Sequence, residues 1–266
     1  MHSTPFKPNG SRNLSSSHPN TLFHFTNIAG LKGILHTSGF QLSYAKEKIR
    51  GPATKVVEMA IPMVSFCDLR LSELNSHMDK YGRYGIGLTK EWSHRQGLNP
   101  VAYINRDSEL ADSVIKGIEE VLNIVIEHPT HDEDHGWTYM NVMNIQRFLK
   151  NYEGPLERNG VVKYENYRFA DEKEWRHVLP LSFAREIWPY AEMKDADSPE
   201  KKRALNEAIK NEILRFVALD VKYIVVEHDS EIRGVQDEIA SLKLSRADTH
   251  HLISRVLSAE RITEDF

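Results

Sequence analysis

The sequence has little of what marks secreted or membrane-embedded proteins. Its 266 residues include one cysteine, Cys67, which excludes an internal disulfide and a cluster of thiolate metal ligands. No run approaches the roughly 18 apolar residues that a membrane-spanning helix requires. Residues 1–20 also lack the apolar core of a signal peptide. We therefore expect a cytoplasmic protein that has no membrane partner.

Neither sign of charge is in large excess. The 34 basic and 38 acidic side chains give a formal charge of −4, so no overall positive field attracts the chain to nucleic acid or anionic lipid. A local basic groove is still allowed. With 40% apolar and 27% charged residues the composition is typical of a globular chain, and it excludes collagen-like, coiled-coil and fully disordered classes.

Standard catalytic and phosphate-binding signatures are also missing. The run GRYGIG at 82–87 lacks the spacing of a dinucleotide-binding loop, and neither a Walker A sequence nor a Gly-x-Ser-x-Gly elbow occurs. The run HPTHDEDH at 128–135 lacks the His-x-x-x-His helix register of a zinc site. A polar surface loop is the favoured interpretation of that run, and no metal is expected.

The order of the hydrophobic patterns predicts an α+β protein. Residues 1–20 are predicted to form a flexible tail, and residues 21–266 a single domain with a C-terminal α/β extension over about 181–266. Residues 21–26 form a strand pattern, Asn27 is a helix cap, and a helix then carries Ile28 and Leu31 at helical spacing. Gly39 stands where a left-handed residue would end that helix.

Further elements follow from periodicity and from capping residues. Strands are predicted at 63–67, 84–88, 101–104, 161–164, 175–179 and 223–226. Helices are predicted at about 71–81, 90–97, from Ser108, after the 128–135 loop, from Ser198 through Phe216, and after caps at Asp229 and Asp248. The polar, Gly-Pro-interrupted stretch 41–59 is interpreted as a basic loop.

The strand histidine is the first residue that could carry chemistry. Alternation turns His24 and Phe23 to opposite faces of their strand. An imidazole at a strand end could donate a hydrogen bond to a ribose hydroxyl. The alternative is a core histidine bonded to a nearby carbonyl, which is the usual role of a lone histidine.

Two carboxylates and two tyrosines are further candidates. Glu172 and Glu174 lie two residues apart, and a carboxylate so placed could stabilise positive charge developing on a sugar ring. A solvated strand face, salt-bridged to Arg176, is the alternative. Tyr81 and Tyr84 flank glycines and offer aromatic faces for a planar heterocycle, although a tight turn into a buried strand explains them equally well.

These phrases together resemble two known groups of proteins. A strand with His in HFT, a helix ending in Gly and an aromatic residue, and a late strand with a glutamate resemble the ADP-ribosyltransferase fold, which is built on a split β-sheet. More closely, YGRYGIGLTKEW and FADEKEWRHV are similar to the AbiGi-type abortive-infection family of bacterial phage-defence proteins. The similarity covers about residues 20 to 180.

The resemblance implies an NAD-dependent ADP-ribosyltransferase toxin that uses NAD as co-substrate and acts on a nucleic-acid or protein acceptor. In that interpretation His24 and Glu174 face each other across one dinucleotide-sized cleft, and an antitoxin protein is a partner. Glu174 would bind the reacting ribose and Glu172 would orient the acceptor. The NAD-binding set implied by position is His24, Phe25, Thr26, Tyr44, Ser65, Tyr81 and Tyr84.

The acceptor and the enzymatic role itself have alternatives. Lys46, Lys48 and Arg50 could follow the backbone of a single-stranded nucleic acid. Ser65-Phe66-Cys67 departs from the Ser-Thr-Ser motif of the transferases, so the residues that contact nicotinamide are not fixed. The competing class is a non-enzymatic antitoxin or sensor of an abortive-infection system. Its mark would be a glutamate buried in a structural salt bridge, with no open cleft.

Overall fold

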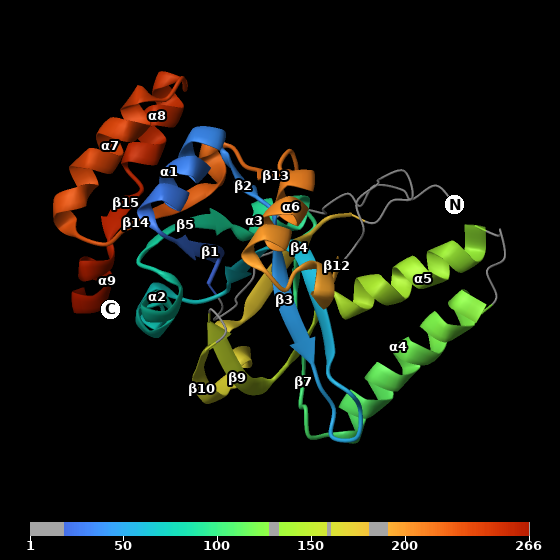
Figure 1. Ribbon diagram of the computed structural model, residues 1–266. Helices are drawn as coiled ribbons and strands as arrows, with labels where there is room; N and C mark the ends of the chain where they lie inside the picture. Colours follow the sequence, from blue (N-terminus) through green and yellow to red (C-terminus); the bar gives the residue numbers. More distant parts are fainter. Residues whose placement is uncertain (1–18, 128–132, 159–160, 181–190, 266) are drawn as a thin grey trace.

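The computed structural model describes residues 19–127, 133–158, 161–180 and 191–265. Over these residues the chain is a mixed α+β protein, in which helices cover both sides of a central sheet (Figure 1). No helix in these ranges is long and apolar enough to cross a membrane.

The strands are distributed along the whole described chain. They are β1 (Thr21–Thr26), β2 (Gly39–Gln41), β3 (Ser43–Ile49), β4 (Val57–Cys67), β5 (Tyr84–Thr89), β6 (Asn99–Pro100), β7 (Ala102–Ile104), β8 (Leu149–Asn151), β9 (Glu153–Arg158), β10 (Val161–Arg168), β11 (Glu174–Val178), β12 (Ala191–Glu192), β13 (Ile213–Arg215), β14 (Val221–Val226) and β15 (Val256–Ser258).

The helices lie between these strands. They are α1 (Ile28–Thr37), α2 (Asn75–Tyr81), α3 (Lys90–Arg95), α4 (Glu109–Glu127), α5 (Glu133–Gln146), α6 (Pro199–Ala208), α7 (Ile232–Ser241), α8 (Arg246–Ile253) and α9 (Ala259–Asp265). Short 3-10 turns include η1 (Leu71–Glu73), η2 (Phe169–Glu172), η3 (Met193–Asp195), η4 (Ala218–Asp220) and η5 (Asp229–Glu231).

In the part of the chain that the structure describes, the central sheet has nine strands, and there are three further two-stranded sheets. Its order is β15-β14-β5-β1-β4-β11-β6, with β3 and β12 also paired to β4. All its pairs are antiparallel except β14–β15, which is parallel. Because β14 and β15 belong to the C-terminal extension, this part of the chain is built into the main sheet.

Both faces of the sheet are buried. On one, which we call the Phe66 face, a large core joins the strands to α1, α3, α7 and α8, and Trp92 at its centre is fully buried. On the other, the Glu174 face, Phe23 and Cys67 pack against α2 and α9, while a second apolar cluster holds Met59 and Val178. Between these two clusters the Glu174 face carries charged side chains.

The start of the fold follows the local signals closely. Asn27 caps α1, and its side chain accepts a hydrogen bond from the Gly30 N–H at 2.8 Å. The prediction that Gly39 adopts the left-handed conformation is wrong. Ser38 adopts that conformation instead, with φ 47°. Gly39 instead begins β2, where a Cβ atom would lie 2.5 Å from Ile213 of the paired strand β13. The glycine therefore permits close strand approach.

The structure of two stretches differs from what their sequence patterns predict. Residues 41–59 are not a loop: β3 and the start of β4 pair along their length around a turn that contains Gly51 and Pro52. The buried residues Leu42, Tyr44 and Ile49 anchor this hairpin. The predicted helix from Ser198 ends at Ala208 rather than Phe216, since Ile213 onward forms β13. Tertiary pairing outweighs helical spacing here.

Near the C-terminus the cap of α8 differs from the prediction. Ser245, not Asp248, caps α8, and its hydroxyl accepts from the Asp248 N–H at 3.1 Å.

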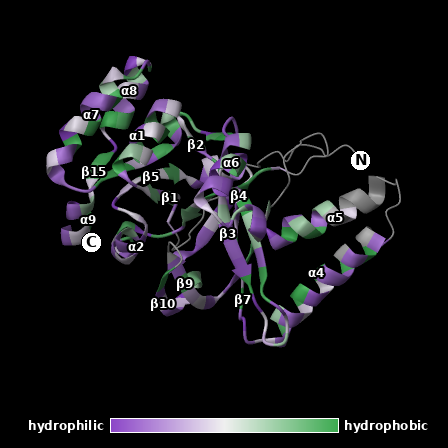
Figure 2. Ribbon diagram, viewed as in Figure 1, coloured by the Kyte–Doolittle hydropathy of each residue, from purple (hydrophilic) through white to green (hydrophobic). Residues whose placement is uncertain are grey.

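The α4 and α5 helices run side by side and project from the sheet, and α4 shows hydrophobic and hydrophilic stretches along its length (Figures 1 and 2).

Candidate functional site

Glu174 is enclosed by cations on the Glu174 face. Its side chain is 6% exposed, and that of Arg176, two residues further along β11, is fully buried. Arg176 donates to both carboxylate oxygens of Glu174, at 2.7 Å and 3.2 Å, and pairs with Glu47 of β3 at 2.9 Å. Ser65 of β4 donates its hydroxyl to Glu174 at 2.7 Å. The oxygens of this carboxylate are thus engaged by the protein itself.

A lysine from β8 joins Glu174 to Glu172. The Lys150 ammonium lies 2.7 Å from the Glu174 carboxylate and 3.2 Å from that of Glu172. Glu172 lies in η2, and Lys173 with φ 46° turns the chain into β11. Tyr81 of α2 donates its hydroxyl to the Glu172 carboxylate. We call Glu47, Lys150, Glu172, Glu174 and Arg176 the buried ion network.

The charges in this network hold one another in the ionised form. Burial alone would raise the pKa of the Glu174 carboxyl, but Arg176 and Lys150 outweigh burial and hold that pKa well below its usual range. Burial alone would lower the pKa of the Lys150 ammonium, and the surrounding carboxylates raise it above its usual value. Burial raises the pKa of Tyr103, whose hydroxyl accepts the Glu174 backbone N–H at 2.8 Å, to about 12.

This arrangement predicts a specific acid sensitivity. Because the folded pKa of Glu174 lies below the unfolded value of about 4.3, its contribution to stability is complete above that pH and is lost as the pH falls towards the folded pKa. In urea unfolding, the stability difference between the wild-type protein and Glu174→Gln should be constant from pH 5 to 8. It should shrink by about 1.4 kcal/mol for each pH unit below about 4.3.

Glu200→Gln provides the matched control, because Glu200 is 72% exposed on α6. Its difference from the wild-type protein should stay small at every pH. A Glu174→Gln difference that did not depend on pH would contradict a depressed carboxyl pKa.

His24 lies on the opposite side of the sheet from Glu174. Phe23 and Glu174 are both register partners of Cys67, so these three side chains point to one face, and His24 points to the other. Its ring contacts Phe40 and Phe66 at centroid distances of 5.1 and 5.7 Å. The expectation that His24 and Glu174 face each other across one cleft is therefore wrong.

The histidine has the alternative role weighed from the sequence. Its Nδ1 lies 2.9 Å from the Ser65 carbonyl oxygen. Burial lowers the pKa of His24, so the ring is neutral at pH 7. His24 is a half-buried histidine that packs against Phe40 and Phe66 and is bonded to a backbone carbonyl of the neighbouring strand.

The other residues of the expected NAD-binding set are dispersed. Phe25 packs on the Glu174 face beside His77, and Thr26 ends β1 opposite Tyr84. Tyr44 is 4% exposed in the core of the Phe66 face. Tyr84 donates its hydroxyl to Glu231 at 2.7 Å. The structure brings Ser65 and Glu174 into contact, and it joins Tyr81 to the same network through Glu172.

The expected acceptor-binding residues lie on and beside β3. Lys46 and Arg50 are exposed, while Lys48 pairs with Glu58 at 3.3 Å and with Glu157 at 3.1 Å. The backbone N–H of Arg50 donates to the side-chain oxygen of Asn151 at 2.9 Å. The paired carboxylates offset part of the positive charge that a nucleic-acid backbone would require.

The described residues do not fit NAD as the resemblance implied. A dinucleotide held between His24 and Glu174 would have to cross the sheet, and the oxygens of Glu174 already have partners. Within the described ranges no group of three or more His, Cys, Asp or Glu is arranged to hold a metal. The histidine-rich run 128–135 lies outside the residues whose side chains are described.

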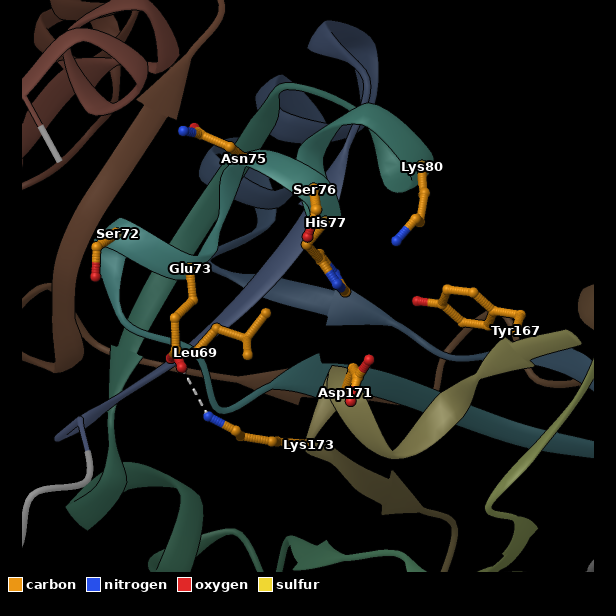
Figure 3. A pocket seen from close by; sticks show the side chains of 10 residues that line it. All are labelled: Leu69, Ser72, Glu73, Asn75, Ser76, His77, Lys80, Tyr167, Asp171 and Lys173. Carbon is orange, nitrogen blue, oxygen red and sulfur yellow. Dashed lines mark hydrogen bonds and ion pairs between the residues drawn. The ribbon is translucent and has the colours of Figure 1, made fainter. Parts of the chain in front are cut away.

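An open cavity lies beside the buried ion network. It has a volume of about 460 Å³, and its lining includes His77, Lys80, Tyr167, Asp171 and Lys173. Figure 3 shows these side chains around the hollow, with Lys173 paired to Glu73 at 3.0 Å. Neither His24 nor Glu174 lines it. Tyr167 links it to the network through a hydrogen bond to Glu172.

Sequence reasoning named Arg176 as a salt-bridge partner on a solvated strand face, but it missed the burial of this pair and the second cation, Lys150. Lys150 gives no signal in the sequence, because it reaches the network only after β8 pairs with β7. Arg176 does give one: Glu174 and Arg176 alternate on one strand, so they share a face, and an arginine on a buried face requires a carboxylate.

Comparison with known proteins agrees with the resemblance seen in the sequence. Residues 38–227 match the family model described as "Putative abortive phage resistance protein AbiGi, antitoxin". The "Abortive phage resistance protein AbiGi" of Lactococcus lactis subsp. cremoris is 26% identical over 248 residues, which cover 82% of this chain and 94% of that protein. No solved structure matches the chain significantly. Since the family model matches residues 38–227, which run from β2 to β14 and make up more than half of the sequence, this chain belongs to the AbiGi family of abortive phage resistance proteins.

Proposed function

We propose that this protein is a non-enzymatic antitoxin of an abortive-infection system, which binds a toxic partner protein and holds it inactive. The description of the matching family as an antitoxin supports this proposal. So does the state of Glu174, the residue that a transferase would need to present to its substrate.

The burial of Glu174 is the observation that carries the proposal. Stabilising a developing positive charge requires a carboxylate whose oxygens face the reacting atoms. Arg176, Lys150 and Ser65 occupy those oxygens, and the side chain is 6% exposed. A carboxylate neutralised in this way stabilises the fold and leaves no free charge for a substrate. This is the salt-bridged state expected of a non-catalytic scaffold.

Co-expression with the toxin tests the proposal. We expect that a toxic protein encoded beside this chain in its own genome stops bacterial growth, and that this chain restores growth and co-purifies with the toxin. Purified alone and incubated with NAD, the chain should release no nicotinamide. Failure to restore growth would contradict the proposal.

One observation favours the transferase as a second candidate. His24, Ser65 and Glu174 lie on the adjacent strands β1, β4 and β11, and Ser65 contacts both of the others. An NAD-dependent ADP-ribosyltransferase with a split-sheet fold would require the buried ion network to open, and it would have to bind NAD without the side chain of His24, which points to the opposite face of the sheet. Label transferred from NAD to RNA, DNA or protein by the wild-type chain would favour this candidate.

A further inference from the structure

A small apolar cavity separates α4 from the body of the protein. Its volume is about 90 Å³. This is far below the roughly 300 Å³ of a site for a drug-sized ligand, so it suits a single side chain. The walls are Ile49, Val57, Leu149 and, from α4, Ile115 and Ile118.

One wall of this cavity holds a polar atom without a partner. Gln146, at the end of α5, lines the cavity and is 5% exposed. Its amide oxygen has no hydrogen-bond partner among the described residues. A buried acceptor left unpaired destabilises the protein, so a donor entering the cavity would be bound favourably. Glu119, an exposed residue of α4, also lines the cavity.

The α4 helix beside the cavity is acidic and partly apolar. The α4 helix contains five carboxylates and one lysine, a formal charge of −4 that equals the charge of the whole chain. Among the described residues of α4 and α5, three large apolar side chains are exposed: Leu110 at 62%, Ile124 at 55% and Ile145 at 59%. The excess of carboxylates on α4 favours a partner surface of positive charge.

We propose that α4 and the C-terminal end of α5 dock a basic surface of the toxic partner, and that a lysine or arginine of that partner enters the cavity. The inference rests on the proposed antitoxin function. The aliphatic stem of such a residue matches the isoleucine, valine and leucine walls, and its cationic end supplies a donor for Gln146 and an opposite charge for Glu119. The acidic surface selects a basic protein over nucleic acid.

A fragment experiment on the full chain tests the cavity. n-Pentylamine, protonated at pH 7, reproduces a lysine stem, and pentanoate has similar length with the opposite charge. NMR should show saturable shifts of the Gln146 side-chain amide and of the Ile115 and Ile118 methyl groups with pentylamine, and at least tenfold weaker binding of pentanoate. Equal binding of the two, or no saturable shift, would overturn the cavity assignment.

Two variants separate the cavity from the surface near it. Gln146→Leu should weaken pentylamine binding about tenfold, the value of one hydrogen bond to a charged donor. If that variant does not fold, Ile118→Phe, which narrows the cavity from half-buried α4, takes its place. Ile145→Phe, on the exposed side of α5, should bind pentylamine as the wild-type protein does.

The cellular test distinguishes this inference from the proposed function. The double variant Glu119→Lys with Glu120→Lys should restore growth in the presence of the toxin at least tenfold less than the wild-type chain. The matched reversal of exposed Glu200 and Glu207 on α6 should act like the wild-type chain. Wild-type rescue that the α4 reversal leaves intact would overturn the inference alone. No rescue by the wild-type chain would overturn the proposed function, whatever the amine binding. Dimers of this chain alone that the α4 reversal dissociates would identify a second copy as the occupant and overturn the inference.

Discussion

Replacing Arg176 by methionine is expected to lower the free energy of unfolding by about 3–5 kcal/mol, the usual cost of removing one partner from a buried ion pair. Arg176 is fully buried and pairs with Glu174 and Glu47. It also donates to the Arg147 carbonyl oxygen at 2.9 Å. Methionine would fill much of the same space but would leave the three carboxylates of the buried ion network with one ammonium, that of Lys150. The midpoint of thermal unfolding should fall by roughly 6 to 20 °C.

An exposed arginine supplies the control for this measurement. Arg203 of α6 pairs with Glu200 at 3.2 Å but is 76% exposed. Its replacement by methionine should change stability by less than about 0.5 kcal/mol. If Arg176→Met unfolded at the same temperature as the wild-type protein, the network would contribute nothing to the fold, and the structural role assigned to Glu174 would fail.

Truncating Trp92 to alanine should destabilise the protein by about 3–5 kcal/mol, because a large cavity would open in the core of the Phe66 face. The side chain is fully buried and contacts Phe40 and Phe66 at centroid distances of 6.1 and 5.4 Å. Its indole N–H donates to the Arg215 carbonyl oxygen at 2.9 Å, which ties α3 to β13. Urea unfolding followed by circular dichroism measures the change.

One companion variant separates packing from hydrogen bonding at Trp92, and a second provides an exposed control. Trp92→Phe keeps an aromatic ring but loses the indole donor, so it should cost less than Trp92→Ala. Leu219→Ala removes a side chain that is 72% exposed and should have an effect within about 0.5 kcal/mol. A loss at Trp92 no larger than the loss at Leu219 would contradict the packing described for this face.

The buried ion network changes what Glu174→Gln means. The transferase interpretation predicts that this variant abolishes toxicity without unfolding the protein. In the structure the same change leaves Arg176 and Lys150 with less opposing charge inside the protein. Loss of stability together with loss of function would therefore say nothing about catalysis. Only NAD turnover by the wild-type chain bears on the enzymatic candidate.

Local patterns predicted many of the elements well. The Asn27 cap and the first helix are predictable because their hydrogen bonds close within a few residues, and the strand before them is predictable from its short apolar run. The residues 84–88 and 223–226 were likewise predicted as strands and lie in β5 and β14. Where an element depends on a distant partner, as at β3 and β13, local polarity and helical spacing were misleading.

By itself, the sequence determined the α+β class, the capped first helix and the resemblance to the AbiGi family, because each of these depends on local patterns of residues along the chain. The tertiary structure alone decided the environment of the candidate site. The register of β1, β4 and β11 put His24 and Glu174 on opposite faces, and the arrival of Lys150 from β8 helped to neutralise the carboxylate. Charge compensation in a protein interior depends on which groups meet in space, and spacing along the chain does not record this.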